Sequence, residues 1–138
     1  MDNGITAGIV IALVGVIASA FIAREAAALR AVPAHRGTMI VLLSYSGSLA
    51  MLGLVVAVLA ASQSGETSAV ALVAPVAALV GAAIMVAAAR GFAAAANRPG
   101  PSDAARMRAS AVSTAALGQG IAILGTVLAM LAIFGVFG

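Results

Sequence analysis

The sequence predicts an all-α membrane protein, with four transmembrane helices arranged as two tandem hairpins that assemble into a cyclic ring. Composition predicts the membrane class, because 64% of the 138 residues are hydrophobic and only 8% are charged. The mean hydropathy is +1.21, a value that no water-soluble domain of this size needs. An internal repeat predicts the two hairpins, and a pattern of small residues predicts the ring.

Four apolar stretches are each long enough to cross a hydrocarbon core of about 30 Å, which takes roughly 20 helical residues. They cover residues 5–23, 38–61, 68–89 and 110–137, and none contains a charged side chain. An ionised group costs about 2.5 kcal/mol or more at the bilayer centre, so this distribution is typical of membrane spans. The whole chain, 1–138, is therefore predicted to form a single membrane domain.

The internal repeat fixes the expected architecture. Residues 50–60 return at 122–132 with seven of eleven positions identical, residues 12–15 return at 78–81, and Arg24 returns as Arg90. The offsets are 72 in the first case and 66 in the other two. Duplication of a membrane unit in this way predicts two copies of one hairpin, at residues 1–64 and 65–138.

The charges predict the orientation. The connections at 24–37 and 90–108 carry net charges of +2 and +3, whereas Asp2 and Glu66 are the only charges on the opposite side. By the positive-inside rule, both arginine-rich connections face the cytoplasm and both termini face outward, which suggests a multi-pass protein of a bacterial or archaeal inner membrane. No basic surface with interleaved aromatic residues is present, so no nucleic-acid partner is expected. The absence of cysteine excludes disulfides and thiolate metal sites.

Small residues recur at helical spacing in the first and third spans. They are Gly8, Ala12, Gly15, Ser19 and Ala23, and then Ala74, Ala78, Gly81 and Ala88. Such residues let helices approach closely in lipid, which fits either generic bundle packing or an inner ring of helices. We expect that one chain cannot bury these faces, so that copies close head to tail with spans 1 and 3 inside and spans 2 and 4 outside.

Gln119 and Gly47 occupy equivalent positions near the middle of the membrane. Each lies eleven residues beyond an arginine, Arg108 or Arg36, and this distance corresponds to about 16 Å of helix. An amide in the membrane needs a hydrogen-bonding partner, and the hydroxyls at the same depth in the first hairpin could supply one. Gln119 is therefore either a polar contact between helices or part of a functional site, with candidate polar neighbours Ser44, Tyr45, Ser48 and Thr126.

The segments 91–99 and 115–131, with the run Gly-Gln-Gly at 118–120, resemble the proteolipid rotor subunits of rotary ATPases. In that family, the outer helix of a hairpin carries a mid-membrane carboxylate, and in the duplicated form the first hairpin can lack this acid. The resemblance is to the duplicated four-helix V-type proteolipid and covers essentially the whole chain. It implies a subunit of a V-, A- or F-type complex that is not itself catalytic and binds no cofactor. It also implies a homo-oligomeric ring in contact with lipids and with stator and central-stalk subunits, with loop contacts at Arg30, Arg36 and Arg98.

The chain departs from this family at the ion position, where Gln119 replaces the acid and Gly47 is vacant. A carboxyl can carry a proton because burial favours its neutral form and a nearby cation favours its ionised form. An amide does not titrate, and it brings no negative charge to neutralise a sodium ion. Three explanations stay open: a natural ring without ion coupling, an engineered imitation of a protonated carboxyl, and a polar cluster that binds lipid or water.

Other functions are less well supported. His35, the only histidine, stands in a turn beside Arg36 and is expected to be solvated, and no nucleophile or acid pair accompanies it, so an enzyme is not indicated. A proton-coupled antiporter needs an intramembrane acid, and the spans contain none. The alternatives to a rotor ring are a carboxylate-free ring with a structural or lipid-binding role and a small holin-like pore.

Overall fold

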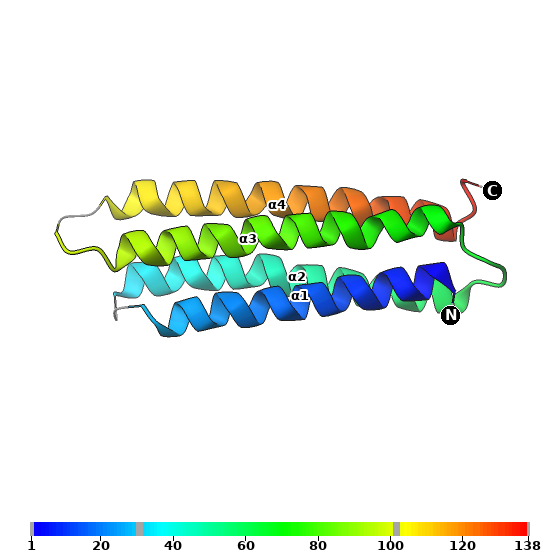
Figure 1. Cartoon of the computed structure of the whole chain (residues 1–138), viewed down its shortest axis with the longest axis horizontal. Coiled ribbons are helices and arrows are strands. Elements are labelled where there is room, and N and C mark those ends of the chain that lie inside the picture. The colour runs from blue at the N-terminus through cyan, green and yellow to red at the C-terminus, as the bar shows by residue number, and fades with distance from the viewer. Residues whose placement is uncertain (1, 30–31, 101–102, 138) are drawn as a thin grey trace.

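The computed structural model describes residues 2–29, 32–100 and 103–137, and the fold is all-α (Figure 1). Its long helices are α1 (Asn3–Ala27), α2 (Pro33–Ser62), α3 (Val73–Ala96) and α4 (Ala104–Ile133), and a short 3₁₀ helix, η1 (Ala69–Leu72), precedes α3. All four long segments are apolar and long enough to cross a membrane. The predicted all-α class is confirmed, and four helices of this length and composition fit an integral membrane protein with several spans.

Local sequence signals set the helix ends. The Asp2 carboxylate caps α1 by accepting hydrogen bonds from the backbone N–H groups of Gly4 and Ile5, and Pro33 is the first residue of α2. The last helix ends at Ile133, four residues before the predicted end at 137. Gly135 adopts a left-handed φ of +79°, and the N–H of Val136 bonds to the carbonyl of Leu131, which together terminate the helix.

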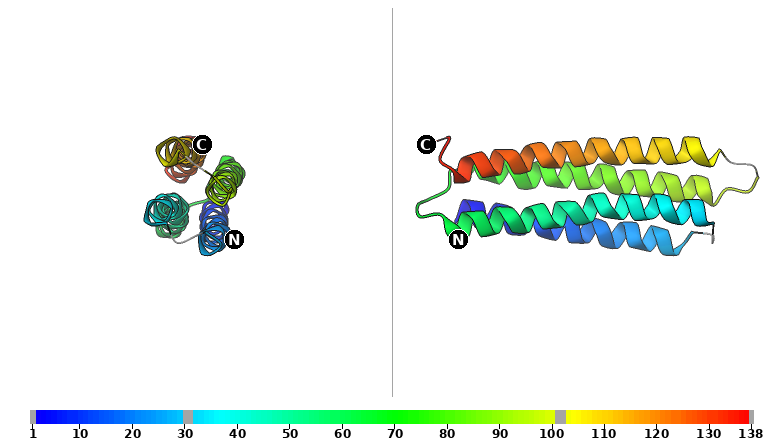
Figure 2. Two further views of the ribbon diagram at one scale, coloured as in Figure 1. Left: turned by 90° about the vertical axis from the view of Figure 1, so that its left-hand side faces the viewer. Right: turned by 180° about the vertical axis from the view of Figure 1, so that it is seen from behind.

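The four helices form a bundle of two layers (Figure 2). α1 packs along α2 and α3 along α4, while α1 also lies beside α3 and α2 beside α4. Both termini and the connection between α2 and η1 lie at one end of the bundle, and the other two connections lie at the opposite end (Figure 1). α1 and α3 thus form one layer, and α2 and α4 form the other.

Glycine and alanine make the closest contacts, between α1 and α2 and between α3 and α4. A Cβ added at Gly15 would come within 2.7 Å of the Cα of Ala50, and one added at Gly53 would come equally close to the Cα of Ala12. Gly81 and Gly118 face each other in the same way on α3 and α4. The expectation that one chain cannot bury its small-residue faces is therefore wrong, because α2 and α4 themselves cover most of these residues.

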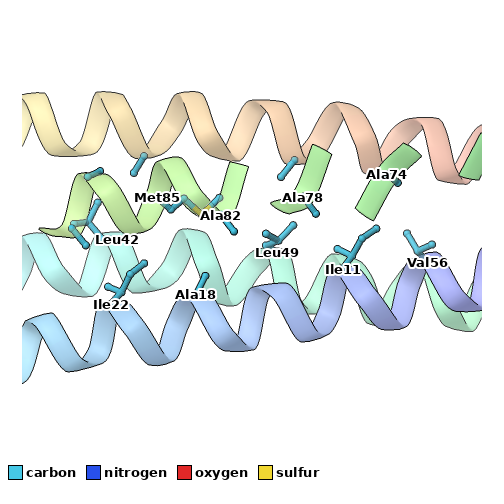
Figure 3. Packing of buried hydrophobic residues seen from close by; sticks show 14 of the residues in the cluster. Ile11, Ala18, Ile22, Leu42, Leu49, Val56, Ala74, Ala78, Ala82 and Met85 are labelled. Atoms are coloured by element: carbon cyan, nitrogen blue, oxygen red, sulfur yellow. The ribbon is translucent and has the colours of Figure 1, made fainter. Parts of the chain in front are cut away.

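A core of larger side chains separates the α1/α2 pair from the α3/α4 pair (Figure 3). Ile11 and Ile22 of α1 and Leu42 and Leu49 of α2 are fully buried there, and they meet a wall of α3 that includes Met85. Side chains of this size keep the two pairs apart, whereas alanine and glycine let the helices within each pair touch.

Candidate functional site

The helix face that contains Gln119 is buried between α4 and its neighbours. Gln119, Thr126 and Ile133 recur every seven residues on α4, and their exposed fractions are 9%, 2% and 8%. We call these three residues the α4 stripe. They lie beside the face that meets α3, which includes Gly118 and Gly125, and so on the side of α4 toward α2.

The opposing helix contributes a matching row of apolar side chains. Leu42, Leu49 and Val56 also recur every seven residues, and all three are fully buried. We call them the α2 stripe. The close contacts of α2 with α1 run through other residues, such as Gly53 and Ala57, so the α2 stripe faces the α3/α4 pair (Figure 3).

Gln119 has an unusual environment within this interface. Its Oε1 atom is buried and has no hydrogen-bond partner among the residues that the structure describes. Gly118 packs against the Gly81 carbonyl of α3, whereas a Cβ at Gly120 would meet nothing within 4 Å. A buried amide oxygen without a partner costs about 1–3 kcal/mol, so the described part of the chain offers no hydrogen bond that would offset the burial of this oxygen.

The hydroxyls proposed as neighbours of this amide make other hydrogen bonds. Ser44 and Ser48 are exposed and donate to carbonyls of their own helix, at 2.6 and 2.7 Å. Thr126 is buried and donates to the carbonyl of Ala122 at 2.9 Å, and Tyr45 is half-buried against the core. The structure thus places Thr126 on the same face as Gln119 but does not bring Ser44 or Ser48 to its oxygen.

A polar contact that the sequence did not single out lies at similar depth in the first pair of helices. Ser19 of α1 donates a hydrogen bond to the Ser46 hydroxyl of α2 at 2.8 Å, and Ser46 is fully buried. The repeat equivalents of these two residues are Met85 and Gly118. The two halves therefore pack differently at this level of the bundle: one has a hydroxyl pair, and in the other Gly118 lies against the Gly81 carbonyl and Ile84.

The end of the bundle that carries the arginines holds three further contacts. His35 is only 6% exposed and its ring stands edge-on to Phe92, with ring centroids 5.4 Å apart, so the prediction of a solvated histidine is wrong. His35 lies in the first turn of α2, where its ring contacts Phe92 of α3. Arg90 pairs with Glu25 at 3.5 Å and lies over the ring of Phe21.

At the opposite end of the bundle, hydrogen bonds of the Asp2 carboxylate and the Asn3 amide with Thr67 join two segments; we call this group of residues the Asp2 clasp. Asp2 accepts hydrogen bonds from the backbone N–H and the hydroxyl of Thr67, both at 2.9 Å, and from the N–H of Gly4 at 2.8 Å. Asn3 donates to the Thr67 carbonyl at 3.0 Å. The Thr67 backbone hydrogen bond is the main reason that the pKa of Asp2 is lowered. These bonds tie the start of α1 to the connection that leads to α3.

The structure describes two of the three loop arginines that the resemblance points to. Arg36 and Arg98 are exposed, and Arg30 lies outside the described residues. Within residues 2–29, 32–100 and 103–137, no group of three acidic, histidine or cysteine side chains could hold a metal ion.

In comparisons with known proteins, no family model and no curated protein matches this chain.

Proposed function

We propose that this chain is a ring-forming membrane subunit of the rotor-proteolipid kind, with tandem hairpins, in which position 119 carries no transferable ion. The observation that supports this proposal best is the asymmetry of the contact between the two repeats. If the repeats were related by a local two-fold axis, each would present the same positions to the other. They present different ones.

Exposed fractions at equivalent positions reveal the asymmetry. The α4 stripe is buried, but of its equivalents on α2, Gly47 is half-buried and Leu54 and Ala61 are exposed, with Leu54 59% exposed. Conversely, the α2 stripe is fully buried, while its equivalents on α4 are exposed at Thr114 and half-buried at Ile121 and Leu128. The first repeat thus uses one flank and the second repeat uses the opposite flank.

The α1/α3 layer shows the same asymmetry between equivalent positions. Ile11 and Ala18 of α1 are buried, and their equivalents on α3, Ala77 and Ile84, are half-buried. Ala82 of α3 is 5% exposed, whereas its equivalent on α1, Val16, is 58% exposed. Because the two repeats meet through unlike faces, each repeat keeps one face that is not used in this contact. The unused face of each repeat is equivalent in sequence to the face that the other repeat buries.

Copies of the chain can therefore add head to tail by repeating the contact that already exists inside each chain. Such heterologous contacts close into a ring or continue as a filament, and a bundle that spans a flat bilayer favours closure. In this ring α1 and α3 would form the inner layer and α2 and α4 the outer one, with Gln119 on the outer helix of the second hairpin. The proposal also includes the partners expected from the sequence, which are lipids and the stator and central-stalk subunits, and an orientation with both termini outward.

Two cysteine pairs test the assembly. His35 and Phe92 touch within one chain, and their repeat equivalents are Met107 and Ala26. In the doubly substituted variant Ala26→Cys/Met107→Cys, mild oxidation of membranes should join different chains into a ladder that ends at one fixed multiple of 13.3 kDa. The matched control His35→Cys/Phe92→Cys should form its bond within a single chain and give no ladder.

Other outcomes separate the alternatives. Cross-linking that stops at dimers would indicate a two-fold assembly and would contradict the proposal, as would the absence of cross-linking between chains while the control pair reacts. The rotor role is tested separately by ion conductance of the purified assembly in planar bilayers. A rotor ring should not conduct by itself, and sustained channel currents would favour the pore-forming alternative.

A further inference from the structure

A groove runs along the face of the α1/α3 layer that points away from α2 and α4. It has a volume of about 630 Å³ and lies between Ile17 and Phe21 on one side and Leu79, Ala83 and Val86 on the other. Its floor is formed by Ala18 and Ala82, which are 3% and 5% exposed. Because alanine ends at Cβ, the floor lies well below the larger side chains of the walls.

The groove has the length of one membrane leaflet. Along α3 it extends from Leu79 to Arg90, eleven residues, which is about 16 Å of helix. Half of the hydrocarbon core is about 15 Å deep. The groove therefore reaches from the arginine-rich end of the bundle to the region of the bilayer midplane, and an acyl chain that lies beside a single leaflet has the same span.

Arg90 stands at the mouth of the groove and is held in place by two neighbours. Its Nε atom is 3.5 Å from the Glu25 carboxylate, and its guanidinium carbon is 5.6 Å from the centre of the Phe21 ring. The side chain still exposes 60% of its surface. Because Glu25 contacts the Nε atom, the two terminal nitrogens, with four of the five N–H donors, can bind a second anion.

We propose that this groove binds a phospholipid with an anionic headgroup, with one acyl chain between α1 and α3 and the phosphate on Arg90. The apolar walls match an acyl chain, and an oriented guanidinium matches a phosphate in bidentate geometry. A second copy of the chain is not the expected occupant. The head-to-tail contacts proposed above use the flanks of the bundle, whereas the groove opens between them.

The probe is the purified protein in nanodiscs made from phosphatidylglycerol and phosphatidylcholine in equal amounts. After transfer into mild detergent, native mass spectrometry counts the lipids that stay bound to each chain. The parent protein should retain phosphatidylglycerol in preference to phosphatidylcholine. In Arg90→Gln, this preference should fall about tenfold, which is the factor that a charge-assisted hydrogen bond of about 1.4 kcal/mol provides.

Two matched controls distinguish this site from general attraction to a basic protein. Arg98→Gln removes the same charge from an exposed loop that does not line the groove, and it should leave the preference unchanged. Ala83→Leu fills the groove and should reduce retention of both lipids, whereas Ala116→Leu, on the exposed surface of α4, should not.

Three results would overturn the proposal. Equal effects of Arg90→Gln and Arg98→Gln would show that only net charge attracts the lipid. Unchanged retention in Ala83→Leu would show that the acyl chain lies elsewhere. If Ala83→Leu instead reduced the size of the assembly, a second copy rather than a lipid would occupy the groove. The cross-linking of Ala26→Cys/Met107→Cys is read independently, so failure of the lipid site and failure of the ring are distinguishable.

Discussion

Replacement of Gly53 by alanine tests the central packing feature of the fold, the direct contact between the backbones of α1 and α2. A Cβ at this position would lie 2.7 Å from the Cα of Ala12 and 2.7 Å from the carbonyl oxygen of Gly8, and it would also clash with the backbone nitrogen of Ala12. Ordinary contacts of a Cβ begin at 3.4 Å. Since every one of these neighbours is backbone, no side-chain rotation can relieve the clash, and α1 as a whole must move.

The expected cost follows from these contacts. Overpacking of a tight interior typically costs about 1–3 kcal/mol. Alanine gains about 0.5–1 kcal/mol over glycine within a helix, which offsets only part of this cost. Gly53→Ala should therefore lower the free energy of unfolding by about 1–2 kcal/mol. Gly47→Ala is the matched control on the same helix, because a Cβ there meets nothing within 4 Å, and it should be neutral or stabilising.

The assay is reversible unfolding of the purified protein in mixed detergent micelles, followed by near-ultraviolet circular dichroism of Tyr45 and the phenylalanines. Opposite signs for Gly53→Ala and Gly47→Ala are the expected result. Equal shifts in the two variants would refute the reasoning, because helix propensity alone would then explain both. A neutral Gly53→Ala would show that α1 can retreat from α2 without losing other contacts.

Three further predictions concern the Asp2 clasp, the amide and the orientation. Asp2→Asn should lower the free energy of unfolding by about 1 kcal/mol, and it should remove the loss of thermal stability that the parent protein shows at acidic pH. Because hydrogen bonds lower the pKa of Asp2, its contribution is present at neutral pH and is lost as the pH falls from 3.8 through the lower folded-state value, which a thermal melt series would detect. Gln119→Glu should react with a hydrophobic carbodiimide while the parent protein does not, and failure to react would mean that position 119 is only a packing position. Cysteine at Ala34 should be labelled only from the cytoplasm and cysteine at Ser64 only from outside, and the reverse pattern would overturn the predicted orientation.

Much of the fold could be predicted because its causes lie within single segments. Span length, absence of charge and the repeat at 50–60 and 122–132 are one-dimensional features, and they predicted four apolar helices. The end of α4 was misplaced because residues 134–137 are apolar yet form a turn around Gly135, and hydropathy does not register a left-handed glycine. The partner of the small-residue faces was also misjudged, because the pattern on α1 does not reveal that Gly53 and Ala57 of α2 are its complement.

The candidate site could be predicted only in part, and the reason is rotation about the helix axis. The predicted depth of Gln119 follows from its distance along the chain to Arg108, so that prediction needs no structure. Which hydroxyls face it depends on the direction of each side chain around α2. Ser44 and Ser48 lie near the same depth but point outward, whereas Ser46 points toward α1 and meets Ser19. The contact between His35 and Phe92 joins two repeats that no local pattern connects.

A ring assembled from the unused faces would contain two kinds of contact between α2 and α4. Within a chain, Gln119 faces the α2 stripe, and between chains Gly47 would take the equivalent place. Since glycine carries no polar side chain, the chain-to-chain contact would form without burying an amide, which would otherwise need a partner from the neighbouring copy. The space around Gly47, where a Cβ meets nothing within 4 Å, leaves room for that neighbour. The duplication would thus confine the amide to the contact made inside each folded chain. The contact between chains would bury apolar side chains together with Thr114, whose hydroxyl already donates to the carbonyl of Ser110.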